Sequence, residues 1–160
     1  MCGIAGFLDF RGIDKDKSKG LLKSMVNTLI HRGPDEEGYY LDQFVALGHR
    51  RLSIIDLESG NQPMVELNKA VIVFNGEIYN FKQVRCELES LGYSFSTNSD
   101  TEVILKSYLQ WGVECLNRLN GMFAFAIWDI EKKILFLARD RIGKKTPLLY
   151  QFQWKNIIWL

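Results

Sequence analysis

Met122-Phe123-Ala124-Phe125-Ala126-Ile127-Trp128 predicts a β-strand with two apolar faces. Alternate side chains of a strand point to opposite faces, so Phe123, Phe125 and Ile127 lie on one face. The other face carries Met122, Ala124, Ala126 and Trp128. Because both faces are apolar, both must be covered by further layers. A second apolar run, Ile134–Ala138, follows the connection Asp129–Lys133 and predicts the antiparallel partner of this strand.

Outside this hairpin, short strand patterns alternate with helical ones. Helices are predicted at Lys17–Ile30, Phe81–Leu91 and Thr101–Trp111, with further helical turns over Val113–Leu119. Strands are predicted at Cys2–Phe10, Gly38–Leu41, Phe44–Ile55, Ala70–Phe74, Tyr93–Thr97, Leu148–Phe152 and Ile157–Leu160. Asn75-Gly76 is expected to end the strand before it in a turn, and Ser99–Glu102 has the form of a helix capping box. Hairpins and helices grouped in this way predict an α+β fold with antiparallel sheet.

The composition is that of a globular domain with a real core. The chain has 160 residues, of which 47% are hydrophobic and 24% charged, and its net charge is +1. A charge so close to zero gives no reason to expect nucleic acid or an acidic membrane surface as partner. No apolar run approaches the ~18 residues of a membrane span, so a cytoplasmic protein is expected. The three cysteines show neither a disulfide framework nor a zinc pattern, and Cys86 and Cys115 are expected to be buried thiols.

Cys2 is the one cysteine with a special position. If Met1 is removed, the Cys2 thiol and a free α-amino group lie on the same residue, as a nucleophile with its own base. The α-amino group titrates near ~7.7–8.0, so part of it is neutral at neutral pH. Taken alone, the position of Cys2 is more typical of an accident of translation start.

Short polar segments interrupt the apolar pattern and give Cys2 its context. They are His31-Arg32-Gly33-Pro34-Asp35, Gly48-His49-Arg50-Arg51-Leu52-Ser53-Ile54, Asn75-Gly76-Glu77-Ile78-Tyr79-Asn80 and Ser99-Asp100-Thr101-Glu102. Together with Cys2-Gly3-Ile4-Ala5-Gly6, Gly121–Ala126 and Arg139–Gly143, they closely resemble the N-terminal glutaminase domain of asparagine synthetases. These domains are class II glutamine amidotransferases, members of the N-terminal-nucleophile hydrolases. The resemblance implies a four-layer αββα sandwich, with two antiparallel sheets between helices, over residues 1–160.

The resemblance also implies a set of site residues. Cys2 would attack the side-chain amide of L-glutamine, and Asn75 and Gly76 would form the oxyanion hole. Arg51, rather than Arg50, would bind the substrate carboxylate, and Glu77 and Asp100 its ammonium group. Backbone around Ile54 and Ile55 would hold the remaining polar atoms.

Several of these residues have a plainer interpretation when the resemblance is set aside. Asn75-Gly76 reads as a turn, Arg51 as a solvated strand residue and Asp100 as part of a helix cap. A Cys–His dyad with His31 or His49 is a further alternative, although it would leave the free amine of Cys2 unused. His49 is otherwise expected to pack within a strand, and His31 to anchor the turn that follows it.

The resemblance implies no cofactor and no metal for this half of the chemistry. ATP and Mg²⁺ belong to a synthetase domain, and the Ser-Gly-Gly-x-Asp loop of that domain does not occur in the sequence. The family pattern Gly-x-Lys-Pro-Leu-Tyr-Tyr is altered at Gly143–Tyr150, where Thr146 is extra. Because the sequence stops at Leu160, we expect a C-terminally truncated domain whose partner is a separate synthetase domain or subunit. Alternatives are a non-catalytic remnant that docks to a partner or binds glutamine, and self-association through the apolar tail.

Overall fold

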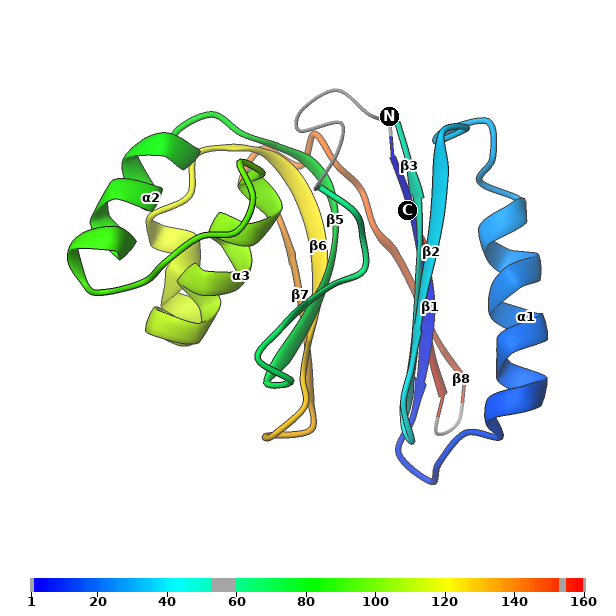
Figure 1. Cartoon of the computed structure of the whole chain (residues 1–160). Coiled ribbons are helices and arrows are strands. Elements are labelled where there is room, and N and C mark those ends of the chain that lie inside the picture. The colour runs from blue at the N-terminus through cyan, green and yellow to red at the C-terminus, as the bar shows by residue number, and fades with distance from the viewer. Residues whose placement is uncertain (1, 53–59, 153–154, 160) are drawn as a thin grey trace.

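The computed structural model describes residues 2–52, 60–152 and 155–159. In this part of the chain the strands form two antiparallel sheets (Figure 1). The five-stranded sheet has the order β2-β3-β1-β9-β8. Its strands are β1 (Gly3–Asp9), β2 (Glu36–Leu41), β3 (Val45–Arg51), β8 (Leu148–Phe152) and β9 (Lys155–Trp159). The four-stranded sheet has the order β4-β5-β6-β7, with β4 (Met64–Glu66), β5 (Ala70–Ile78), β6 (Gly121–Asp129) and β7 (Ile134–Arg139).

Helices cover the outer faces of both sheets. Figure 1 shows α1 (Lys15–Asn27) against the five-stranded sheet, and α2 (Phe81–Ser90) and α3 (Asp100–Trp111) on the far side of the four-stranded sheet. A 3₁₀ helix, Gly112–Asn117, continues from α3, as the pattern at Val113–Leu119 predicts. This arrangement confirms the predicted α+β fold of four layers.

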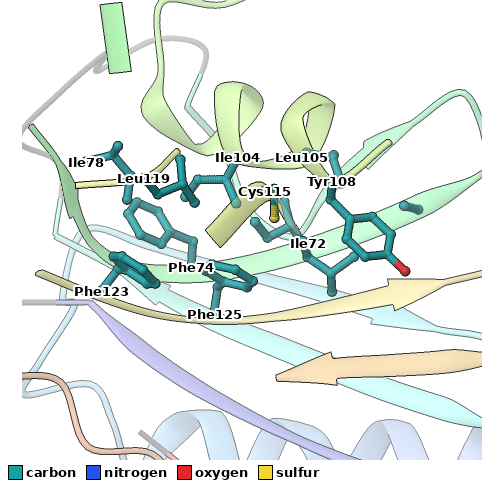
Figure 2. Packing of buried hydrophobic residues seen from close by; sticks show 12 residues of the cluster. Ile72, Phe74, Ile78, Ile104, Leu105, Tyr108, Cys115, Leu119, Phe123 and Phe125 are labelled. Atoms are coloured by element: carbon teal, nitrogen blue, oxygen red, sulfur yellow. The ribbon is translucent and has the colours of Figure 1, made fainter. Parts of the chain in front are cut away.

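Strand β6 has the two buried faces that its sequence predicts. Phe123, Phe125 and Ile127 pack in the core beneath α3, and Figure 2 shows the two phenylalanines facing Ile104 and neighbouring apolar side chains. On the other face, Ala124, Ala126 and Trp128 pack between the two sheets against residues such as Ile4 and Leu47. The register pairs β6 with β5 over nine positions and with β7 over six, which makes β6 an interior strand.

Strand β5 corrects the turn predicted at Asn75-Gly76. The strand continues through both residues to Ile78, and Asn75 and Gly76 pair with Ala124 and Phe123 of β6. An Asn-Gly pair favours a turn only where nothing holds the chain extended. Here the long interior neighbour β6 supplies hydrogen bonds past Gly76, so tertiary pairing overrides the local preference.

Two further expectations differ from the structure. No strand forms at Tyr93–Thr97, because its two aromatic side chains pack against the α2–α3 pair without a neighbouring strand. Cys86 is exposed, because α2 turns Val84 and Leu88 to the core and Cys86 away from them, whereas Cys115 is buried as predicted. The short strand β4 is a pairing that the sequence pattern does not reveal.

The first helix is shifted toward the N-terminus relative to the predicted Lys17–Ile30. The Asp14 side chain caps it by accepting from the backbone N–H groups of Asp16 and Lys17 at 3.1 and 3.2 Å. At the other end, the Thr28 hydroxyl donates to the Met25 carbonyl at 2.7 Å, and the chain turns away from the helix. The turn brings Arg32 back to the start of β1, where the site lies.

At the other edge of the five-stranded sheet, β8 carries exposed apolar side chains. Leu148, Leu149 and Tyr150 are 67%, 58% and 61% exposed. No helix in the described residues is long and apolar enough to cross a membrane. The predicted β3 segment beyond Leu52, with Ile54 and Ile55, lies outside the described residues.

Candidate active site

Cys2 lies immediately before β1, at the end of the five-stranded sheet. Its Sγ accepts from the backbone N–H of Leu52 at 3.4 Å, and it lies 3.7 Å from the Leu52 carbonyl oxygen. The Arg32 guanidinium donates through Nε to the Cys2 carbonyl at 3.2 Å. The backbone of Leu52, just after β3, and the Arg32 side chain from the turn after α1 therefore fix the position of Cys2.

Cys2 opens onto a cavity of about 120 Å³ between the ends of the two sheets. Cys2 and Arg51 reach it from the five-stranded sheet, and residues of β5 and of the start of α3 complete it. The predicted site residues among its lining are Cys2, Arg51, Asn75, Gly76, Glu77 and Asp100. All the predicted site residues within the described part of the chain are thus brought together, although they come from positions up to 98 residues apart in the sequence.

Asn75 presents an unsatisfied donor to this cavity. The residue is 2% exposed, and its Nδ2 has no hydrogen-bond partner among the described residues. A buried amide N–H₂ without a partner costs about 1–3 kcal/mol. Such a group is retained at a site where a ligand oxygen can accept from it.

The Gly76 N–H points to the same side of the strand. The N–H groups two residues before and after it, on Phe74 and Ile78, donate to the side chains of Gln62 and Asp100 at 2.6 and 3.0 Å. Since N–H direction alternates along a strand, the Gly76 N–H lies between these two and faces the cavity. A Cβ at Gly76 would lie 2.2 Å from the Met122 carbonyl oxygen, so only glycine fits beside β6.

The two arginines at the end of β3 have different surroundings. Arg51 is 5% exposed and lines the cavity, and its Nη1 donates to Glu36 at 2.8 Å and to Asn61 at 2.9 Å. Arg50 instead turns to α1, where its Nη2 donates to Asn27 at 2.8 Å. The structure therefore places Arg51, and not Arg50, at the cavity, and the interpretation of Arg51 as a solvated residue is wrong.

Two carboxylates, Glu77 and Asp100, lie on the cavity wall. Burial, with a smaller contribution from the neighbouring Glu77, raises the pKa of Asp100 to about 6, against hydrogen bonds from backbone N–H groups such as that of Ile78. A cationic group placed between these two carboxylates would be attracted by both. Ser99, not Asp100, caps α3, and its hydroxyl accepts from the Glu102 N–H at 3.3 Å. The Glu102 side chain does not close the capping box but reaches back to Ser96 and Thr97.

Neither histidine is among the residues that line the cavity with Cys2. His49 is 1% exposed and its Nε2 donates to the Phe74 carbonyl at 3.0 Å. Burial lowers the pKa of His49 to about 4, so the ring is neutral. His31 is exposed on the turn after α1. The structure thus gives no support to a Cys–His dyad.

Gln62 and Lys145 are among the lining residues that were not predicted as site residues from the sequence. Gln62 bridges β5 and α3, since its Oε1 accepts from the Phe74 N–H and its Nε2 donates to the Thr101 hydroxyl at 3.3 Å. The pairing of β4 with β5 ends at Ile72, and beyond it the Gln62 side chain accepts from the next outward N–H of β5, that of Phe74. Lys145 lines the cavity from the loop between β7 and β8. Lys145 stands where the family pattern Gly-x-Lys has its lysine, but no site role was inferred from that match.

Comparison with known proteins agrees with this geometry. The family model described as "Glutamine amidotransferase domain" matches residues 1–160. Among curated proteins, asparagine synthetase [glutamine-hydrolyzing] 3 of Bacillus subtilis (strain 168) is 44% identical over 153 residues, covering 94% of this chain and 25% of the relative. Asparagine synthetase B [glutamine-hydrolyzing] of Escherichia coli (strain K12) is 42% identical over 144 residues, covering 89% and 26%. The chain therefore spans about a quarter of the length of these relatives.

Solved structures share the fold at lower identity. The allosteric regulatory enzyme of purine biosynthesis matches with a TM-score of 0.78 at 20% identity, over 99% of this chain and 41% of that one. Glutamine phosphoribosylpyrophosphate amidotransferase from B. subtilis matches with a TM-score of 0.74, also at 20% identity and over the same shares of both chains. The match over the whole length and the high identity to the curated relatives show that the chain belongs to the glutamine amidotransferase domain family, in the form found in glutamine-hydrolysing asparagine synthetases.

Proposed function

We propose that this chain hydrolyses L-glutamine to L-glutamate and ammonia, with Cys2 as the nucleophile. The observation that carries the proposal is the buried Asn75 Nδ2, which lacks a partner among the described residues and lines the same cavity as the Cys2 thiol. Amide hydrolysis develops negative charge on the carbonyl oxygen, and preorganised donors stabilise it. Asn75 Nδ2 and the Gly76 N–H supply two such donors.

The rest of the cavity suits the backbone end of a free amino acid. Arg51 offers its guanidinium to the substrate carboxylate. In the structure this guanidinium donates to Glu36 and Asn61. Glu77 and Asp100 offer two carboxylates to the ammonium group. These charges lie away from the amide and fix which way the substrate enters, so that its side chain extends toward Cys2.

The reaction runs in two steps once Cys2 is the N-terminal residue. In the first, the Cys2 sulfur attacks the side-chain carbonyl carbon while the α-amine takes the thiol proton. That proton passes to the leaving nitrogen, the C–N bond breaks, and ammonia departs from a thioester. In the second, water adds to the thioester with the amine as base, the C–S bond breaks, and glutamate leaves with the thiol restored.

The names of the relatives extend this proposal to the fate of the ammonia. They are glutamine-hydrolysing asparagine synthetases, and this chain matches only about a quarter of their length. We propose that the ammonia is passed to a synthetase domain or subunit, the part of such a ligase that uses ATP and Mg²⁺, and that the glutaminase half needs no cofactor. A nucleophilic free thiol is kept reduced in the cytoplasm, where we place the reaction.

A glutaminase assay on chain whose Met1 has been removed, verified by mass spectrometry, tests the proposal. Cys2→Ala is expected to abolish glutamate release, whereas Cys86→Ala, which alters an exposed thiol on α2, should leave it unchanged. An N-terminal tag that cannot be removed keeps the thiol but converts the amine to an amide, and activity should collapse. Full activity with the blocked terminus would rule out the single-residue mechanism. Binding of glutamine without turnover would favour the glutamine-binding alternative.

A further inference from the structure

The part of β5 beside the cavity has a neighbouring strand on one side only. Strand β6 pairs with β5 along its whole length, whereas β4 pairs with it only as far as Ile72. Beyond Ile72, the N–H groups of Phe74, Gly76 and Ile78 point to the side that β4 leaves uncovered, since N–H direction alternates along a strand. Among the described residues no strand takes that place. The Gly76 N–H, one of the two proposed oxyanion donors, therefore lies on an open strand edge.

Two side chains bond to this edge, one on either side of Gly76. The Phe74 N–H donates to Gln62 Oε1 at 2.6 Å, and the Ile78 N–H donates to Asp100 Oδ2 at 3.0 Å. Both side chains line the cavity, as Gly76 does. The Gly76 N–H is thus bracketed by two anchored neighbours. Asp100 already has a proposed role with the substrate ammonium, whereas the mechanism proposed above gives Gln62 none.

Gln62 is itself held by both halves of the sandwich. Its backbone packs on β2, where a Cβ at Gly38 would lie 1.9 Å from the Gln62 carbonyl oxygen, so only glycine leaves room. Its side chain reaches the other half, and its Nε2 donates to the Thr101 hydroxyl on α3 at 3.3 Å. His49, which pairs with Gly38, donates through Nε2 to the Phe74 carbonyl at 3.0 Å. The peptide groups of Phe74 are therefore held from the five-stranded sheet and from α3 together.

These contacts bear on the direction in which the Gly76 N–H points. A strand paired on one side only can twist about that pairing, and hydrogen bonds on its other edge limit the twist. Oxyanion donors stabilise the transition state only when they are aimed at the developing charge. A misplacement of about 1 Å in an active site can cost about 10²-fold in rate. Whatever fixes Phe74, two residues before Gly76, therefore affects the rate.

We propose that Gln62 is a positioning residue for the oxyanion hole. By accepting from the Phe74 N–H and donating to Thr101, it fixes the end of β5 against α3 and so sets the direction of the Gly76 N–H. It acts through β5 and contacts no reacting atom. The role in turnover rests on the proposed function, but the direction of the N–H does not, so it can be measured without glutamine.

The first test measures residual dipolar couplings of backbone N–H groups by NMR, which report the direction of each N–H in the folded chain. Gln62→Met removes both hydrogen-bonding ends of the side chain at similar size. We expect it to change the Gly76 coupling, while N–H groups of β6, such as that of Ala126, keep theirs. Gln83→Met, the same change at an exposed residue of α2, should leave the Gly76 coupling as in wild type. Thr101→Val should change it in the same direction, and Thr101→Ser, which keeps the hydroxyl, should restore it.

The second test is steady-state glutaminase kinetics on the same variants with Met1 removed. Gln62→Met should lower kcat by about tenfold to a hundredfold with little change in KM, because the donor that it misdirects acts in the transition state. Thr101→Ser and Gln83→Met should keep the wild-type kcat. A residue with a merely structural role would lower stability to urea and leave the kcat of the folded enzyme unchanged.

An unchanged Gly76 coupling in folded Gln62→Met would overturn the proposal, and so would a wild-type kcat in that variant. If Gln62→Met does not fold, Thr101→Val, which keeps the buried volume, decides by the same two measurements. If wild type releases no glutamate, the proposed function alone is contradicted. The couplings then still decide whether Gln62 sets the direction of the Gly76 N–H.

Discussion

Among single residues, Asp100 connects burial most directly to a measurable pH dependence. Burial, with a smaller contribution from Glu77, raises the pKa of Asp100 to about 6, although backbone N–H groups oppose the shift. Below about pH 6 the carboxylate therefore becomes neutral and no longer attracts the substrate ammonium. We expect the KM for glutamine to rise by about tenfold per pH unit below pH 6, because the fraction of competent enzyme falls in that proportion. Steady-state kinetics across the range would measure this.

Asp100→Asn is the control for this pH dependence. The variant should have a high KM that does not respond to pH in this range, with kcat much less affected, since the ammonium lies away from the amide. The effect on folding has the opposite sign. A carboxyl whose pKa is raised from 3.8 to about 6 by folding favours the native state below pH 3.8, and this stability is lost as the pH rises through 6. Asp100→Asn should thus resist urea at pH 7 at least as well as wild type. Unfolding of the variant would instead give Asp100 a structural role.

Site residues that stand in short motifs could be predicted from the sequence, whereas those that matter only because of where they are packed could not. Cys2, Arg51, Asn75, Gly76, Glu77 and Asp100 each stand in a short motif of the resembled family, and the cavity brings all of them together. Ile54 and Ile55 lie outside the described residues, so their part stays a prediction. Lys145 and Gln62 escaped because their importance comes from where the chain packs them. In Gly143-Lys144-Lys145, the family pattern Gly-x-Lys singles out Lys145, but the pattern does not say that this side chain lines the cavity.

The segment before α3 shows how an element can be positioned by one side chain. Both carboxylate oxygens of Glu102 accept backbone N–H bonds, Oε1 from Ser96 at 2.9 Å and Oε2 from Thr97 at 2.7 Å. Lys106 lies 3.2 Å from Oε1. Burial raises the pKa of Glu102, but these donors outweigh burial and lower it overall. The carboxylate therefore orders the segment that leads into Asp100.

We expect Glu102→Gln to weaken both the fold and glutamine binding. An amide has one oxygen, so its N–H₂ group would face a backbone N–H and leave it unsatisfied, at a cost of about 1–3 kcal/mol. Urea unfolding would measure this loss, and KM should rise with little change in kcat because the displaced group is Asp100. Glu131→Gln, the same change at an exposed hairpin residue, is the matched control. A Glu102→Gln variant as stable as wild type would contradict the role of the Glu102 carboxylate in ordering the segment before α3.

At the level of elements, strands whose own sequence pattern is sufficient were predicted correctly. Segments whose structure depends on a neighbouring strand were not. Strand β6 and its hairpin with β7 follow from alternation alone. Asn75-Gly76 favours a turn locally, but nine residues of β5 pair with β6 and keep it extended. Tyr93–Thr97 alternates like a strand and has no strand beside it. Local preference fails in both directions when a neighbouring strand, or the lack of one, decides the outcome.

For the whole molecule, the stacking of sheets and helices in layers could be predicted from the sequence. The position of the site could not, because it depends on the order of the strands within each sheet. Two apolar faces on one strand require cover on both sides, and helices at each end of the stack provide the outer cover. Which strand ends meet depends on sheet order, and β1 lies between β3 and β9, an order that periodicity does not contain. The cavity arises because the ends of β3 and β5 face each other across the sheet interface.

A ligand in this cavity should therefore bind the two sheets to each other. Arg51 and Cys2 belong to the five-stranded sheet, while Glu77 on β5 and Asp100 on α3 belong to the other half of the sandwich. In Cys2→Ala, where no turnover occurs, L-glutamine at about 100 times its Kd should add about 2.7 kcal/mol of stability. For a domain of this size that is a rise in Tm of about 5–10 °C. D-glutamine should give almost no rise in Tm. With its side-chain amide directed at residue 2, it cannot place its carboxylate at Arg51 and its ammonium group at the two carboxylates. Differential scanning fluorimetry measures both, and Asp100→Asn in the same background should reduce the shift. Equal shifts with both enantiomers would mean that the cavity does not read the backbone end of the amino acid.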